Sequence, residues 1–336
     1  MGHIKKKRPR RGSLAYWPRK RVRDVRGHVG TWSQLKDLKA PKLLGFCGYK
    51  AGMTSVNVID NRPKVPTKGE EINYAVSIVE TPPMKPFSVR LYSQTPYGLH
   101  LISEAVADNL DKDLLRVLIQ VKKRNSTLLE LKAKLPQACR VAVLCHMQPR
   151  DTGLGKKTPE IFEFPVAGGT LDEQFSYATS ILGKDVQFSD VFKAGEFVDA
   201  HGVTKGKGFQ GMIQRFGIKL ERHKAEKGQR HRSTMGPITP PRVGWWIAQS
   251  GQMGLHQRTE FNRQILKVAD VKTMNPNPVS GISHYGLVRG NYVLIAGSVP
   301  GAKKRLITFT HPARPRKNLH WQAPEIVALS RRSQQG

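Results

Sequence analysis

The sequence predicts a mainly β fold that carries an inserted α+β domain, a long basic loop and an extended N-terminal arm. Short stretches of alternating polarity, such as Asn73–Val79, recur between Gly and Pro turns on both sides of residues 100–190. This is typical of a small barrel or sandwich. Residues 100–190 contain helical apolar stripes instead. Residues 205–255 follow neither pattern, so we expect this segment to form no core of its own.

Most of the expected strands lie before residue 100 and after residue 190. Leu43–Asp60 is predicted to form a strand, a turn at Gly48–Gly52 and a second strand. Strands at Asn73–Val79 and Phe87–Leu91 follow, separated by a Pro-rich interval. The later strands are expected at Glu196–Asp199, Ile265–Val271, Gly286–Ile295 with a turn at Gly290 and Asn291, and Arg305–Phe309. We expect strands from both sides to close one sheet system.

The insert between these strands combines helices with a short buried strand at Arg140–His146. Thr127–Leu135 has an apolar stripe at helical spacing with a candidate N-cap at Ser126, and Gly183 would end the last helix. The expected helices are Ser103–Leu110, Lys112–Val121, Thr127–Leu135 and Leu171–Leu182.

Charge is unevenly distributed along the chain, which carries 56 Lys+Arg against 25 Asp+Glu and a formal net charge of +31. Residues 1–26 hold eleven basic residues and one acid, and residues 203–242 hold ten against two. Residues 100–190 hold twelve of each. A strongly cationic segment without a core needs a polyanion on which to condense. The basic segments therefore predict a nucleic-acid partner, whereas the insert is expected to be an ordinary globular domain.

These patterns divide the chain into seven segments. They are a basic N-terminal arm over 1–40 that orders on its partner, a first part of the β-barrel over 41–99, the inserted α+β domain over 100–190, a barrel strand over 191–204, a basic RNA-penetrating loop over 205–255, the remainder of the barrel over 256–312, and a C-terminal tail over 313–336.

Other features argue against other classes of protein. Three cysteines without a CxxC pair indicate neither a disulfide framework nor a zinc site, and they suit a reducing compartment. No apolar run reaches the ~18 residues of a membrane span, and the N-terminus lacks a signal peptide, so we expect a soluble intracellular protein. The glycine-rich residues 202–211 lack the Walker A spacing. No catalytic motif, cofactor or metal site is expected, and Glu260 is interpreted as an ion-pair partner.

The basic loop offers residue types that suit RNA. Its glycines within residues 202–211 would let the backbone approach phosphate, with Lys205 and Lys207 as point charges. Histidines and arginines further along can contact phosphate and stack on bases. Trp245 and Trp246 are equally well explained as base-stacking residues and as hydrophobic anchors.

Nine stretches of the sequence point to one family. They are RPRRGSLAYWPRKR (Arg8–Arg21), GYKAGMT (Gly48–Thr54), ETPPM (Glu80–Met84), TPYG (Thr95–Gly98), VTKGKGFQG (Val203–Gly211), RFG (Arg215–Gly217), GQMGLHQRTEFN (Gly251–Asn262), HYG (His284–Gly286) and GSVPGAKKR (Gly297–Arg305). Through them the chain resembles the universal large-subunit ribosomal protein three family in its archaeal and eukaryotic form. The resemblance implies a six-stranded barrel related to those of translation factors, a mostly helical insert, and a basic loop and arm that run into large-subunit rRNA.

The resemblance also implies a structural role without catalytic activity. Such a protein would act early in assembly of the large subunit and would lie near the factor-binding region, with its loop tip approaching the peptidyl-transferase centre. The implied partners are large-subunit rRNA and neighbouring large-subunit proteins, with one copy per cytoplasmic ribosome, no membrane and no small-molecule substrate. Ile238 departs from the family, because it occupies the position where a loop-tip tryptophan is expected. A non-ribosomal RNA-binding architectural protein and an RNA-modifying enzyme remain as alternatives.

The residues expected to contact RNA lie mainly in the arm and the loop. They are Lys5, Lys6, Lys7, Arg8, Arg10, Arg11, Trp17, Arg19, Lys20, Arg21, Lys50, Lys205, Lys207, Arg215, Arg222, His223, Lys224, Lys227, Arg230, His231, Arg232, Ile238, Arg242, Trp245, Gln252, His256 and Arg258.

Overall fold

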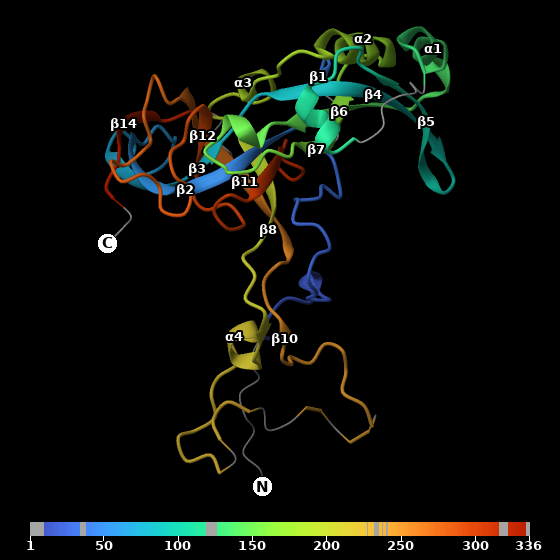
Figure 1. The fold of residues 1–336 in the computed structure, drawn as a ribbon. Coiled ribbons are helices and arrows are strands. Elements are labelled where there is room, and N and C mark those ends of the chain that lie inside the picture. The colour runs from blue at the N-terminus through green and yellow to red at the C-terminus, as the bar shows by residue number, and fades with distance from the viewer. Residues whose placement is uncertain are drawn as a thin grey trace. The chain divides into compact units, whose positions relative to one another are not determined.

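The computed structural model divides the chain into two compact units (Figure 1). The basic unit comprises Met1–Val25 and Val203–Gln257, and the sheet unit comprises Arg26–Gly202 and Arg258–Gly336. The structure describes residues 10–33, 38–118, 126–226, 228–231, 235–236, 238–239, 241–315 and 322–333. The fold is mainly β, as the sequence predicts.

One sheet of the sheet unit closes on itself. Among the described residues it has seven strands, in the order β13-β8-β11-β12-β3-β2-β14, and β13 also pairs with β2. The bounds are β2 (Gly45–Ile59), β3 (Glu71–Glu80), β8 (Phe197–Val203), β11 (Gln257–Asp270), β12 (Asn291–Ala296), β13 (Leu306–Thr310) and β14 (Glu325–Leu329). The sheet is therefore ring-like, and it joins strands from both sides of the insert.

The predicted turn at Gly48–Gly52 is wrong, because β2 runs through it as one strand. A β-bulge between Lys50 and Gly52 shifts the register against β3 instead. A Cβ on Gly48 would lie 2.7 Å from Cγ1 of Val79, so this glycine permits close packing between strands. Glycine, which marks turns in many sequences, here lies inside a strand.

A second sheet has five strands within the described part of the chain, in the order β1-β7-β6-β4-β5. Its strands are β1 (Lys42–Leu43), β4 (Met84–Thr95), β5 (Gly98–Val106), β6 (Arg140–Met147) and β7 (Glu160–Ala167), and all their pairings are antiparallel. β4 was expected to belong with the first strands of the barrel. Pro82 and Pro83 separate it from β3, and since proline cannot donate a ladder hydrogen bond the chain passes from one sheet to the other there.

The helix predicted at Ser103–Leu110 is also wrong. Residues 98–106 form β5, in which Ser103 pairs with Leu91 and Val106 pairs with Ser88. Pairing with β4 overrides the local helical pattern, because propensity is a weak term beside tertiary packing. Of Lys112–Val121, the described part contains a 3-10 turn, η2 (Lys112–Arg116), and residues 119–125 lie outside the described residues.

The two later helix predictions are confirmed. α1 (Leu128–Ala133) begins one residue later than expected, because Thr127 rather than Ser126 caps it through Oγ1 to the amide of Glu130. α2 (Leu171–Ile181) begins with a capping box, and Gly183 follows its end. α2 packs against β4, β6 and β7, as Figure 1 shows. The remaining short helical elements of the sheet unit are η3 (Leu135–Gln137), η4 (Pro149–Asp151) and α3 (Phe188–Val191).

The later strand predictions are confirmed with shifted ends. Glu196–Asp199, Ile265–Val271 and Arg305–Phe309 correspond to β8, β11 and β13. Of Gly286–Ile295, only the part after the turn forms a strand, β12, whereas Gly286 makes an isolated bridge with Ile282. Among the described residues, no helix is both long and apolar enough to cross a membrane.

A buried carboxylate of the core, that of Glu80, ties distant segments together. Glu80, only 1% exposed, accepts hydrogen bonds from the Tyr285 hydroxyl and from the amides of Arg289 (2.7 Å) and Gly290 (3.2 Å). Burial, and next the charge of Glu80, raises the pKa of Tyr285. Around it the core is apolar, with edge-on contacts such as Phe46 to Phe188 at 5.3 Å between ring centroids.

Candidate nucleic-acid interface

The basic unit contains little regular structure. Its elements among the described residues are η1 (Leu14–Tyr16), β9 (Phe209–Gln210), α4 (Met212–Phe216) and β10 (Gly251–Gln252). β9 and β10 pair antiparallel, and Figure 1 shows α4 beside β10. A ribbon of only two residues a side is too short to be stable alone. Contacts beyond this ribbon therefore have to hold the ends of the basic loop together.

Backbone hydrogen bonds join the two ends of the loop. The Lys207 amide donates to Met253 (2.9 Å), and the Met253 amide donates to Gly208 (2.9 Å). Gly254 allows this close approach, since its φ is +74° and a Cβ there would lie 1.9 Å from the Lys205 carbonyl oxygen. The loop base is thus built by backbone geometry that only glycine permits at this position.

The N-terminal arm attaches to the same base. The Val22 amide donates to the Leu255 carbonyl at 2.9 Å, and Nδ1 of the buried His256 lies 3.0 Å from the Lys20 carbonyl oxygen. Nη1 of Arg19 donates to the Arg215 carbonyl at 2.6 Å. Arm and loop residues that lie 196 to 236 positions apart in sequence therefore form one structural unit.

Arg215 connects three parts of this unit. Its Nε donates to the Gln252 carbonyl (2.9 Å), its Nη1 to Gln249 (2.9 Å) and its Nη2 to Arg19 (3.2 Å). Burial lowers the pKa of the guanidinium, which nevertheless stays charged because an arginine pKa begins above 12. The planar fork of donors suits this role, since it reaches several carbonyls at once. The geometry gives Arg215 a structural role within the basic unit.

Aromatic rings and arginines pack around Phe216 in what we call the Arg–aromatic cluster, consisting of Arg10, Trp17, Arg19, Arg215, Phe216, Trp245 and Trp246. Trp17 stacks on Phe216 with 5.5 Å between centroids, and Trp245 meets Trp17 edge-on at 6.0 Å. Cζ of Arg19 lies 4.1 Å from the Phe216 ring centroid. Such cation–π contacts stabilise a site rich in positive charge.

Exposed cations surround this framework. Those described in the basic unit are Arg10, Arg11, Lys20, Arg21, Arg23, Lys205, Lys207, Lys219, Arg222, Lys224, Arg230 and Arg242, and His223 and His231 are exposed beside them. Asp24, Glu221 and Glu226 are the acids within the same described ranges. The excess positive charge is therefore uncompensated inside the unit. Phe209 (78% exposed) and Trp245 (64%) add free aromatic surface next to it.

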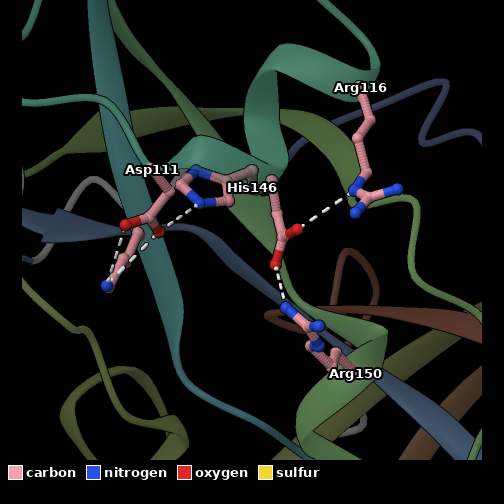
Figure 2. Close-up of polar contacts among 6 residues, drawn as sticks. Asp111, Arg116, His146 and Arg150 are labelled. Atoms are coloured by element: carbon pink, nitrogen blue, oxygen red, sulfur yellow. Dashed lines mark hydrogen bonds and ion pairs between the residues drawn. The ribbon is translucent and has the colours of Figure 1, made fainter.

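In the sheet unit, charged side chains form ion pairs with one another, as Figure 2 shows for six residues. His146, itself 3% exposed, places Nε2 2.9 Å from Asp111, and Nζ of Lys85 lies 3.3 Å from the same carboxylate. Burial opposes ionisation of Asp111, but the bonds from His146 and Lys85 prevail and its pKa is lowered. Arg116 and Arg150 both pair with Asp113 (3.1 and 3.2 Å). These cations are paired with acids of the same unit.

The structure places the predicted contact residues in four groups. Lys5, Lys6, Lys7, Arg8, Lys227 and Arg232 lie outside the described residues. Arg10, Arg11, Lys20, Arg21, Lys205, Lys207, Arg222, His223, Lys224, Arg230, His231, Ile238, Arg242 and Trp245 are exposed in the basic unit. Trp17, Arg19, Arg215, Gln252 and His256 are half-buried or buried within that unit. Lys50 and Arg258 belong to the sheet unit.

Lys50 is placed contrary to expectation. It is 8% exposed, and its Nζ donates to the carbonyls of Val299 (2.7 Å) and Gly301 (3.2 Å). The ammonium group thus stabilises a neighbouring loop of the sheet unit. Gly206 differs too, because a Cβ there would meet Leu255 at 2.9 Å, so packing explains this glycine, whereas Gly208 has open space around it and φ of +66°.

Sequence reasoning missed Phe209 and Phe216. Phe216 is the buried centre of the Arg–aromatic cluster, and Phe209 is the most exposed phenylalanine described in the unit. Both are isolated aromatic residues in a segment without apolar periodicity. An aromatic residue in such a segment is expected to pack in a local cluster or to stack on a ligand. The isolated aromatic residues in the sequence were therefore a signal that could have identified both. Arg23 and Lys219 were also omitted, although both are exposed there.

The expected ion pair of Glu260 is confirmed, since Nη2 of Arg263 lies 2.7 Å from its carboxylate. The three cysteines are free thiols; Cys47 and Cys145 are buried, and Cys139 is exposed. Within the described ranges, no group of three His, Cys, Asp or Glu side chains could hold a metal ion. The arrangement in the basic unit suits phosphate contact by exposed cations and stacking by exposed rings.

Comparison with known proteins points the same way. The family model described as "Ribosomal protein L3" matches residues 1–334. The chain is 45% identical over 341 residues to "Large ribosomal subunit protein uL3" of Caldivirga maquilingensis, with 97% of each chain covered. It is 43% identical to the protein of that name from Pyrobaculum calidifontis (98% of this chain, 99% of the relative) and 42% identical to that from Methanocorpusculum labreanum (98% and 99%). Because family match and similarity both extend over almost the entire length, the chain belongs to the ribosomal protein L3 family.

Proposed function

We propose that this protein is a structural constituent of the large ribosomal subunit and binds large-subunit rRNA through its basic unit. The relatives named as large-subunit proteins support the first part. The observation that carries the second is the contrast between the two units. Among the described residues of the basic unit, twelve exposed Lys and Arg stand against three acids, whereas the cations at Asp111 and Asp113 in the sheet unit are paired. A prebuilt cationic framework can neutralise and clamp folded RNA.

The basic unit would enter the RNA, and the sheet unit would lie nearer the subunit surface. In this proposal the six strands that close the ring, β13-β8-β11-β12-β3-β2, are the translation-protein barrel, with β14 outside it and residues 100–190 as its inserted domain. The loop tip, residues 236–242, would approach the peptidyl-transferase centre, and the protein would act early in assembly, one copy per subunit, without catalytic activity. Ile238, 91% exposed, is available at the tip for contact with bases.

Salt dependence of RNA binding tests the role of Lys205 and Lys207. Both are exposed, and replacing both by alanine removes two phosphate contacts. Each contact contributes about 0.7–0.9 to the slope of log affinity against log salt, so the slope should fall by about 1.4–1.8 with purified large-subunit rRNA. The matched control replaces Lys132 and Lys157, two exposed lysines of residues 100–190, and should leave the slope unchanged. Equal slopes for both double variants would contradict the proposed interface.

Two further experiments separate the alternatives. A structural subunit protein should remain at stoichiometric amount with large subunits through a high-salt sedimentation wash, whereas a modifying enzyme or a non-ribosomal protein should be lost. Deleting residues 236–242 should perturb tRNA accommodation or antibiotic response more than it reduces incorporation into the subunit. Failed assembly, with normal function of the few subunits formed, would show that the tip is an anchor instead.

A further inference from the structure

The hairpin of β4 and β5 contains one of the uncharged stretches of this highly charged chain. The twelve residues 91–102 contain no Asp, Glu, Lys or Arg, although charged residues make up 24% of the sequence. At that frequency, 24% of twelve, about three charges would be expected. The hairpin is part of the sheet unit, and Figure 1 shows β5 at the margin of the five-stranded sheet.

Apolar side chains cover the tip of this hairpin. Tyr97, in the turn that joins Thr95 to Gly98, is fully exposed (101%), and Leu99 and Leu101 are 47% and 37% exposed. Leu99 and Leu101 lie two residues apart on one strand, so they share a face of the sheet. Tyr92, opposite Leu101 across the pair, extends the same face. The result is an apolar strip at solvent.

The strip has a defined end. Beyond Tyr92, Nε of Arg90 pairs with Glu104 at 3.0 Å and its Nη1 with Glu163 at 3.1 Å. These partners neutralise the arginine, which therefore offers little positive charge to an outside ligand. The strip thus runs from Tyr97 to an ion-pair group with a formal net charge of −1.

The backbone beside this strip is also available for pairing. Among the described residues, β5 pairs with β4 on one side and with no strand on the other. Its later half meets α1 and the residues around it, since the hydroxyls of Ser103 and Ser126 lie 2.6 Å apart. The open stretch is therefore 98–102. Edge strands of this kind present alternate amide and carbonyl groups outward, and a long apolar edge is an aggregation hazard unless something covers it.

The chemistry of the strip favours protein over RNA as its partner. Protein–RNA contacts draw on cations that neutralise phosphate, and residues 91–102 supply none. The exposed Phe209 of the basic unit shows the contrasting case, because exposed Lys205 and Lys207 precede it closely in sequence. An uncharged edge strand with alternate apolar side chains suits a β-strand added from another protein.

We propose that the free edge of β5, residues 98–102 together with Tyr97, is a docking site for an extended segment of a neighbouring large-subunit protein. The segment pairs its backbone with β5 and sets apolar side chains against Leu99 and Leu101, and Tyr97 inserts among apolar side chains of the partner. That the neighbour is a large-subunit protein rests on the proposed function. That the partner is a protein rests on the uncharged, apolar edge of the hairpin.

Site-specific photo-crosslinking tests the identity of the occupant. A diazirine amino acid is placed at Tyr97 or, for comparison, at Phe209, and large subunits carrying each variant are purified through a salt wash and irradiated. Tyr97 should yield a product with one protein of the subunit, mapped by mass spectrometry to an extended segment of that protein, whereas Phe209 should crosslink to RNA. A product of Tyr97 with RNA or with a second copy of this chain, or no product, would overturn the docking site.

Charge substitution provides the matching test of the edge itself. The double variant Leu99→Lys, Leu101→Lys should reduce the yield of the Tyr97 product at least tenfold, and both positions are exposed enough to leave the fold intact. Val279→Lys is the control, since Val279 is a fully exposed apolar residue elsewhere in the sheet unit (108%). Equal yields in both variants would reject the edge as the contact. Absence of the unmodified chain from large subunits would instead reject the proposed function, and with it the identity of the partner.

Discussion

Replacing Arg215 by lysine tests whether this residue holds the basic unit together. Its guanidinium donates to three carbonyls, those of Gln252, Gln249 and Arg19, and a lysine ammonium placed on one of them would leave the other two without their donor. At about 0.5–1.5 kcal/mol for each lost hydrogen bond, the local stability of the unit should fall by about 1–3 kcal/mol. The contact with Phe216 is retained in part, because lysine also interacts with aromatic rings.

Hydrogen exchange of the full-length protein measures this loss directly. The Val22 amide bonds the arm to the loop, and the amides of Lys207 and Met253 join the two ends of the loop; we call this region the joint. All three amides exchange when the joint opens. A loss of about 2 kcal/mol raises exchange roughly 30-fold, since 1.4 kcal/mol corresponds to a factor of ten. Amides of the sheet unit should be unaffected.

Arg222→Lys serves as the control, because Arg222 is exposed in the same unit. It should leave exchange at the joint unchanged. If Arg215→Lys and Arg222→Lys gave the same exchange, the joint would not depend on the guanidinium fork. If Arg215→Ala lowered the salt slope of RNA binding as much as Lys205→Ala does, Arg215 would be a phosphate contact and the reasoning from its carbonyl bonds would be refuted.

Three further predictions concern the sheet unit. Glu80→Ala should lower the free energy of unfolding by about 3 kcal/mol in denaturant titration, because it leaves a buried hydroxyl and two amides without their acceptor. His201 is buried between Thr259 and Thr310, and burial first, then His28, lowers its pKa to about 4. The unfolded chain therefore binds a proton that the folded chain does not, and stability should fall by up to about 1.4 kcal/mol per pH unit as pH drops from 6.5 towards 4. Of the three thiols, only the exposed Cys139 should react with a thiol reagent in the native state.

For each of these three predictions, one experimental result would contradict it. An unfolding midpoint for Glu80→Ala within error of the parent would mean that the carboxylate does not hold its three donors. His201→Gln should flatten the pH dependence between 4 and 6.5, and an unchanged profile would assign that dependence to other groups, of which His311 is the first to examine because burial also lowers its pKa to about 4. Native-state labelling of Cys47 or Cys145 would contradict their burial.

The sequence by itself determined the mainly β class and most of the strands. Period-two alternation identified Asn73–Val79, and Arg140–His146 was expected as a short buried strand, which agrees with the burial of β6. The sequence also indicated a helix over Leu171–Leu182 ended by Gly183, and the structure adds the capping box of Thr170 and Glu173 at its start. The distribution of charge separated the basic segments from residues 100–190. The exposed cations of the basic unit lie in these segments.

Tertiary structure decided the features that depend on distant partners. Glycines at Gly48–Gly52 looked like a turn, yet packing against β3 makes them part of one strand, and residues 103–106 follow β4 rather than their own helical pattern.

The same holds for charged residues. Lys50, Arg215 and Lys205 are equivalent cations in the sequence. The first two donate to carbonyls of residues 34 to 251 positions away, whereas the third faces solvent. A charge can be counted locally. Whether it is available to a ligand depends on which carbonyls and rings the fold brings to it, because desolvating a cation is tolerated only where such partners replace its water.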